Sequence, residues 1–86
     1  MSIIIKYKDR VWEFSPSWDS TYRALLKFNE FLVTRKVSNI NDLAMLNRAI
    51  VYLKKFNDPD LQKLVKEIET EVSKLVSEFG KREFLR

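Results

Sequence analysis

The chain has 86 residues, enough for one domain, and contains neither cysteine nor histidine. Disulfides and thiolate zinc sites are therefore excluded, as is the imidazole that metals and acid–base catalysis use most often. A single glycine leaves no phosphate-binding glycine loop, and 16 basic against 12 acidic residues give a net charge of +4.

Residues 1–15 alternate between apolar and polar side chains, which predicts a two-stranded β-hairpin. A two-residue turn at Asp9-Arg10 would place Lys6 opposite Glu13 on the outer face. The apolar side chains then share the other face, which consists of Ile3, Ile5, Tyr7, Trp12 and Phe14. Because two strands alone are marginally stable, we expect this face to lie on the helices.

Residues 16–35 and 39–56 are predicted as two helices. Ser15-Pro16 favours the first helix start, since serine caps helices well and proline is tolerated at the first helical position. Asn39 and Asp42 resemble a capping pair for the second helix. Its middle is apolar nearly all round, which is typical of a helix that lies centrally or at an interface.

A third helix is predicted over residues 58–79. Asp58 is a favourable cap and Pro59 suits the first helical turn. Apolar residues then recur every 3.5 positions and form a seam, which consists of Leu61, Val65, Ile68, Val72, Leu75 and Phe79. Gly80 is a natural stop that leaves residues 80–86 as a short basic tail, although the helix could also continue through it.

These elements predict a single domain over residues 1–86, mainly α (α+β), with a short N-terminal β-hairpin followed by a three-helix antiparallel bundle. The seam of residues 61–79 has two interpretations. It packs on the other helices of the same chain, or it forms an interface with a second copy. The apolar surface exceeds what one small core obviously absorbs, so both uses can coexist.

The first functional hypothesis follows from this surplus apolar surface and from the missing catalytic groups. We expect a small non-enzymatic protein–protein interaction module, either a homodimer or an adaptor subunit of a larger assembly. No cofactor, metal or small-molecule substrate is expected. No run of residues approaches the about 20 apolar positions of a membrane helix. The first residues do not resemble a signal peptide, so we expect a cytoplasmic location and no membrane association.

The alternative hypothesis is a small basic DNA- or RNA-binding protein. The contact residues would be basic side chains of the hairpin and the second helix, namely Lys6, Lys8, Arg10, Lys54 and Lys55. Further basic residues could extend this surface, namely Arg23, Lys27, Lys81 and Arg82. Residues 58–79 carry a net charge of −3, so the third helix is expected to be the part least suited to nucleic acid. Its Glu67 and Glu71 are expected to form a solvated, ion-paired surface with Lys63 and Lys74.

Overall fold

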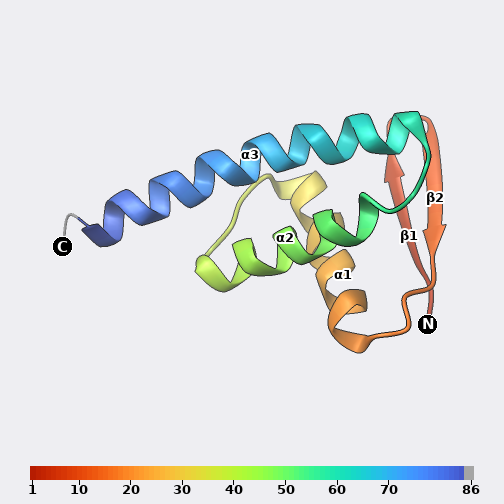
Figure 1. The fold of residues 1–86 in the computed structure, drawn as a ribbon, viewed down its shortest axis with the longest axis horizontal. Coiled ribbons are helices and arrows are strands. Elements are labelled where there is room, and N and C mark those ends of the chain that lie inside the picture. Colours follow the sequence, from red (N-terminus) through yellow and green to blue (C-terminus); the bar gives the residue numbers. More distant parts are fainter. Residues whose placement is uncertain (85–86) are drawn as a thin grey trace.

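The computed structural model describes the backbone of residues 1–84 and the side chains of residues 1–81. Two antiparallel strands, β1 (Ile3–Tyr7) and β2 (Arg10–Phe14), precede three helices (Figure 1). The helices are α1 (Asp19–Thr34), α2 (Ile40–Leu53) and α3 (Pro59–Phe84). The predicted fold class, a mainly α protein with an N-terminal hairpin followed by three helices, is confirmed.

Helix α2 is the central element of the fold. It contacts both α1 and α3, as its nearly all-round apolar middle predicts. In Figure 1, α2 and α3 run in opposite directions, α1 crosses α2 steeply, and the hairpin stands at the end where α3 begins. All five elements contribute side chains to one core, in which Ile5, Phe28, Leu46 and Ile68 are fully enclosed. The hairpin therefore completes the core of the helices, as expected for a ribbon that is unstable alone.

The hairpin register differs by two residues from the predicted one. Ile3 pairs with Phe14 and Tyr7 with Arg10, so the turn lies at Lys8-Asp9. The predicted Lys6–Glu13 pair is wrong, since Lys6 lies opposite Val11 and Glu13 opposite Ile4. A shift of two residues keeps every side chain on its predicted face, because side chains alternate with a period of two. The alternation therefore predicts the faces of the hairpin but does not decide between these two registers.

The first helix begins later than predicted. Residues 15–18 connect the end of β2 to the first residue of α1 (Figure 1), so Pro16 lies before the helix. The position before the first helical residue is occupied by Trp18, whose side chain makes no capping hydrogen bond. At the other end, Arg35 adopts a left-handed conformation with φ of 56°. Its N–H donates to the carbonyl of Phe31 and ends the helix.

The capping pair predicted for α2 is confirmed. The Asn39 side chain accepts a hydrogen bond from the N–H of Asp42 at 3.0 Å. The Asp42 carboxylate in turn accepts one from the N–H of Ser38 at 2.9 Å. The helix ends at Leu53, three residues before the predicted end.

The third helix does not end at Gly80 but continues to Phe84, the alternative that the sequence left open. Gly80 has no positive φ, so it does not act as a left-handed helix terminator. Glycine inside a helix costs only about 1 kcal/mol relative to alanine, which is too little to force an end. The predicted tail is thus helical as far as residue 84, and residues 85 and 86 lie outside the described part of the chain.

Candidate functional site

The start of α3 is joined to the hairpin by acidic side chains. Oδ1 of Asp58 accepts hydrogen bonds from the N–H groups of Asp60 at 3.0 Å and Leu61 at 3.1 Å, which caps α3 as predicted. Oδ2 accepts from the guanidinium of Arg10 at 2.9 Å and the indole N–H of Trp12 at 3.1 Å. Arg10 also pairs with Asp60. One carboxylate therefore both begins α3 and holds the hairpin against it.

The electrostatics of this junction favour the ionised carboxylate. The backbone hydrogen bond from Leu61 lowers the pKa of Asp58 below its ordinary value. Partial desolvation opposes this effect, but the hydrogen bonds from Trp12 and Arg10 and the charge of Arg10 also lower the pKa, so that the pKa of Asp58 is lowered overall. The cap of α2 behaves alike, since the backbone hydrogen bond from Ser38 lowers the pKa of Asp42.

Two of the five residues predicted to contact nucleic acid are occupied by ion pairs within the chain. Arg10 binds Asp58 and Asp60, and Nζ of Lys54 lies 2.5 Å from a carboxylate oxygen of Glu69. Arg10 lies on the inner face of the hairpin, because it is two residues from Trp12. That parity was readable in the sequence and argues against Arg10 as a contact at the exposed tip.

The other three predicted contacts are exposed. Lys6 lies on the outer face of the hairpin. The ammonium groups of Lys8 and Lys55 lie 5.4 and 5.9 Å from the ring centres of Tyr7 and Tyr52. These aromatic rings also contact the core, so they are not available as a stacking platform for bases.

Three glutamates on the flanks of α3 bond to the hairpin and to the ends of the other helices. The pairs are Glu67 with the Tyr7 hydroxyl (3.1 Å), Glu69 with Lys54 (2.5 Å) and Glu71 with Arg35 (2.6 Å). The predicted pairing of Glu67 and Glu71 with lysines of the same helix is therefore wrong. Partial burial of the guanidinium by itself lowers the pKa of Arg35. The hydrogen bond to Glu71 and the negative charge of this carboxylate act in the opposite direction, and the pKa of Arg35 is raised overall.

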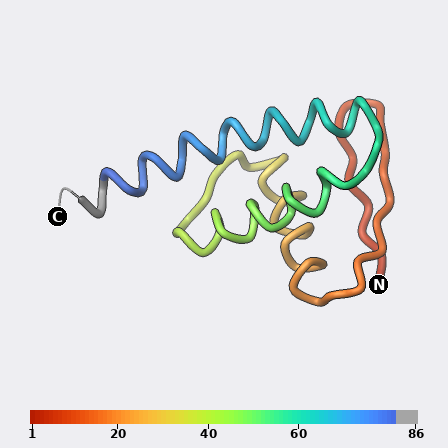
Figure 2. Tube along the Cα trace, in the orientation of Figure 1, coloured from red at the N-terminus to blue at the C-terminus, as the bar shows by residue number. Residues whose placement is uncertain are grey.

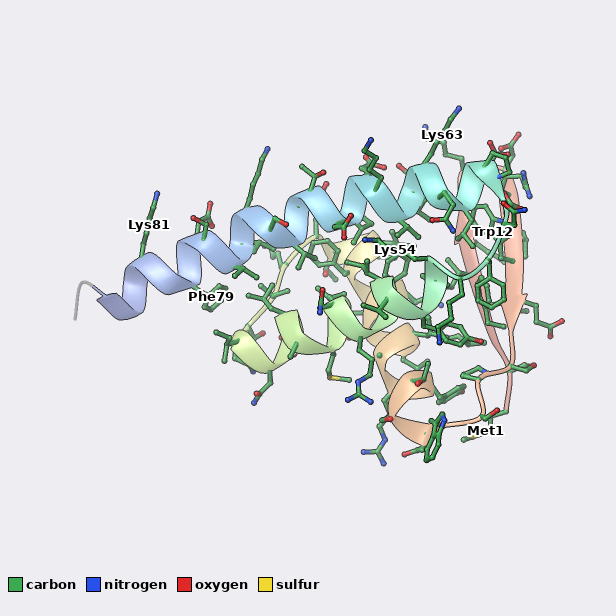
Figure 3. The ribbon with its side chains drawn as sticks, viewed as in Figure 1. Met1, Trp12, Lys54, Lys63, Phe79 and Lys81 are labelled. Atoms are coloured by element: carbon green, nitrogen blue, oxygen red, sulfur yellow. The ribbon has the colours of Figure 1, made fainter. Side chains whose placement is uncertain are left out.

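With these glutamates held at the flanks, the outward face of α3 is basic. The residues of this face are three or four positions apart in the sequence, and all are exposed. They are Lys63, Lys66, Thr70, Lys74, Ser77 and Lys81. In the part of the chain that the structure describes, none of the four lysines pairs with a carboxylate. Figure 3 shows Lys63 and Lys81 extending from the same side of α3, away from the rest of the molecule. We call these four lysines the lysine ridge.

The ridge shows that the net negative charge of residues 58–79 does not describe every face of α3. The expectation that α3 is least suited to nucleic acid summed these charges, whereas the helix separates them by direction. Lysines lie along the crest and acids beside it, with the exposed Glu67 one turn from Lys63 and Glu78 one turn from Lys74, because a helix turns 100° per residue. The periodic spacing of Lys63, Lys66, Lys74 and Lys81 was the sequence signal that could have revealed this face. Lys81, predicted as an extension of the hairpin surface, belongs to the ridge, and the side chain of Arg82 lies outside the described residues.

The apolar seam is buried along its first part. Leu61, Val65, Ile68 and Val72 are at most 5% exposed, so here the seam packs within the same chain. Leu75 and Phe79 are only partly buried, at the edge of the core. Of the two interpretations, intrachain core is thus confirmed for residues 61–72.

At its C-terminal end the third helix outruns its neighbours. Figure 2 shows α3 continuing past the start of α2 toward the C-terminus. The side chain of Val76 is 49% exposed, and Ile40 at the start of α2 is 51% exposed. A shallow groove of about 300 Å³ lies between the middle of α2 and residues 69–76 of α3. It is lined by Asn47, Ile50, Glu69, Val72, Ser73 and Val76. We call it the α2–α3 groove.

A second hollow lies beside the hairpin turn. It measures about 310 Å³ and is lined by charges of both signs, including Lys8 of the turn and Lys63 of the lysine ridge. Among the described residues, no three acidic side chains come together in a way that could hold a metal ion.

Comparison of the chain with protein-family models, with curated proteins and with solved structures finds no match. Within the described residues, no helix has both the length and the apolar character needed to cross a membrane. The function is therefore argued from the surfaces of this fold alone.

Proposed function

We propose that the protein is a small interaction protein that pairs with a second copy of itself through the exposed end of α3 and the α2–α3 groove. The observation that carries this proposal is the change in burial along the apolar side of α3. Ile68 is fully buried, whereas Val76, which flanks the seam, is half exposed in a groove whose lining includes Ile50 and Val72. Exposed apolar surface next to a groove is typical of a helix-docking surface.

The shape of the chain supports pairing with a second copy. The radius of gyration is 13.3 Å, whereas about 12 Å is expected for a compact chain of this length. The accessible surface is 6157 Å², roughly 750 Å² above the ~5,400 Å² expected for its mass. The chain is thus more extended, with more exposed surface, than a compact chain of its mass.

A second copy is the occupant that best fits the groove. The end of α3 carries the 3.5-residue apolar spacing that helices use to pack against each other. The same chain therefore supplies both a helix to dock and a groove to receive it. In a two-fold symmetric dimer each copy docks its own helix and receives the helix of the other copy. Two-fold symmetry is the commonest symmetry of protein oligomers.

The test is the mass of the protein in solution, measured by light scattering over a wide range of concentration. We expect a species of twice the 10.3 kDa chain mass at high concentration. Val76→Glu places a charge in the proposed interface and should leave a folded monomer. Val33→Glu is the matched control, since Val33 is 85% exposed on α1 and should leave pairing intact.

A wild-type protein that is monomeric at every concentration contradicts the proposal. So does pairing that Val33→Glu abolishes and Val76→Glu does not, because the interface would then lie on α1. Circular dichroism of each variant checks that the fold is retained. The adaptor role and the cytoplasmic location expected from the sequence stay predictions.

A further inference from the structure

The lysine ridge lies on the side of α3 that no other element covers. Helix α2 packs on the opposite side, and nothing stands above the outer face in Figure 1. The ridge runs from Lys63 to Lys81, about 27 Å at 1.5 Å per residue. Thr70 and Ser77 separate the lysines with small hydroxyl side chains, and the exposed acids Glu67 and Glu78 lie beside the row. Four lysines against these two acids leave a net positive charge along this face.

We propose that the lysine ridge binds the phosphate backbone of double-stranded DNA without sequence preference. Its four ammonium groups are point charges that can each neutralise a phosphate. The ridge contains no arginine, asparagine or glutamine, which are the side chains that read base edges most often. Contacts of this kind fix position on a duplex but carry no sequence information.

The composition of the ridge favours a duplex over a single strand. Single-strand binding proteins stack bases on aromatic side chains, and no aromatic residue lies between the lysines of the outer face. A helix is about 10–12 Å wide, which matches the about 12 Å width of the DNA major groove. The major groove of an RNA duplex is too narrow for such a helix. DNA is therefore the polyanion whose shape this face fits.

The placement of the apolar face of α3 argues against an anionic membrane surface. Interfacial helices insert an apolar face into the lipid, whereas the apolar face of α3 is turned toward the core. The outer face of α3 therefore lacks the apolar side chains that anchor an interfacial helix in lipid.

The test is the salt dependence of binding to a short fluorescent DNA duplex of arbitrary sequence, followed by anisotropy. Four phosphate contacts predict a slope of log K against log salt of about −3.6. Affinity should then fall roughly 150-fold between 50 and 200 mM salt. Lys66→Ala/Lys74→Ala should halve the slope to about −1.8, a loss of roughly 12-fold over the same range. Alanine favours the helix at both exposed positions, so the variant should fold.

The matched control is Lys6→Ala/Lys55→Ala, which removes the same charge from two exposed lysines outside the ridge. We expect this variant to keep the wild-type slope. If it halves the slope while the ridge variant does not, the hairpin and the end of α2 bind the duplex and the proposal is wrong. Absence of binding at low salt also overturns it.

Three other polyanions complete the test, namely single-stranded DNA, polyglutamate and vesicles that contain phosphatidylserine. We expect each to bind more weakly than the duplex at equal salt. Equal binding to polyglutamate or to the vesicles would show a generic polycation and overturn the proposal. The inference does not rest on dimerisation, because the ridge variant halves the slope for a monomer and for a dimer alike.

Discussion

The two halves of α3 share one sequence pattern but have different surroundings. In residues 59–72 the seam is buried, and three glutamates on the flanks bond to the hairpin, α1 and α2. In residues 73–81 the pattern continues, yet Val76 is half exposed. Val76 lines the α2–α3 groove with Asn47 and Ile50 of α2, so it is exposed at the side of the contact between the two helices and not beyond the end of α2. An apolar period therefore predicts which face is apolar, while the packing of the neighbouring helix decides how much of it is covered.

The largest expected effect separates the two halves directly. Ile68→Ala removes a fully buried side chain and should lower the free energy of unfolding by about 2–5 kcal/mol. Val76→Ala shortens a half-exposed side chain and should cost less than about 1 kcal/mol. Urea denaturation at low protein concentration measures both values with little contribution from pairing of copies. Equal losses would contradict the contrast between the halves.

A smaller effect concerns the loss of folding stability at acid pH and the N-terminal end of α3, where Asp58 caps the helix. Asp42 and Asp58 have folded-state pKa values below the ordinary 3.8. Each stabilises the fold while ionised, and this stability is lost as the pH falls from about 4 through the folded pKa. Asp58→Asn should keep the helix cap, since asparagine caps as well as aspartate. It should nevertheless reduce the acid-induced loss, because the variant no longer has this carboxylate to protonate.

Urea midpoints measured from neutral pH to below 3.8 give the acid profile of each variant. The control is Asp9→Asn, because Asp9 in the hairpin turn makes no side-chain hydrogen bond or ion pair within the described residues. We expect its profile to follow that of the wild type. An Asp58→Asn profile that also matches the wild type would mean that the negative charge of Asp58 does not contribute to holding the hairpin against α3.

The smallest effect concerns the exposed end. Gly80 is helical, and a Cβ added there meets no atom within 4 Å. Gly80→Ala should stabilise the local helix by about 1 kcal/mol and slow amide exchange in residues 77–81 roughly fivefold. The melting temperature should stay nearly constant, because this end opens without the core. A rise in melting temperature comparable to that from stabilising the core would show that the end unfolds together with the core.

The candidate surfaces were only partly predictable from the sequence. The seam of residues 61–72 was predicted correctly, because its 3.5-residue period is local. The basic surface was assigned to residues 6–10 and to Lys54 and Lys55, where two of the five side chains are in fact paired with acids. The summed charge of residues 58–79 hid the lysine ridge, because a sum ignores the direction in which each side chain leaves the helix.

The sequence by itself determined the features that depend on neighbouring residues. These are the two faces of the hairpin, the caps at Asn39 and Asp58, and the three helices, because period and capping act within a few positions. Only the tertiary structure decided the hairpin register, in which the side chains of Arg10 and Trp12 meet Asp58 across more than 45 residues. It likewise decided how far the seam is buried, since this depends on what packs alongside.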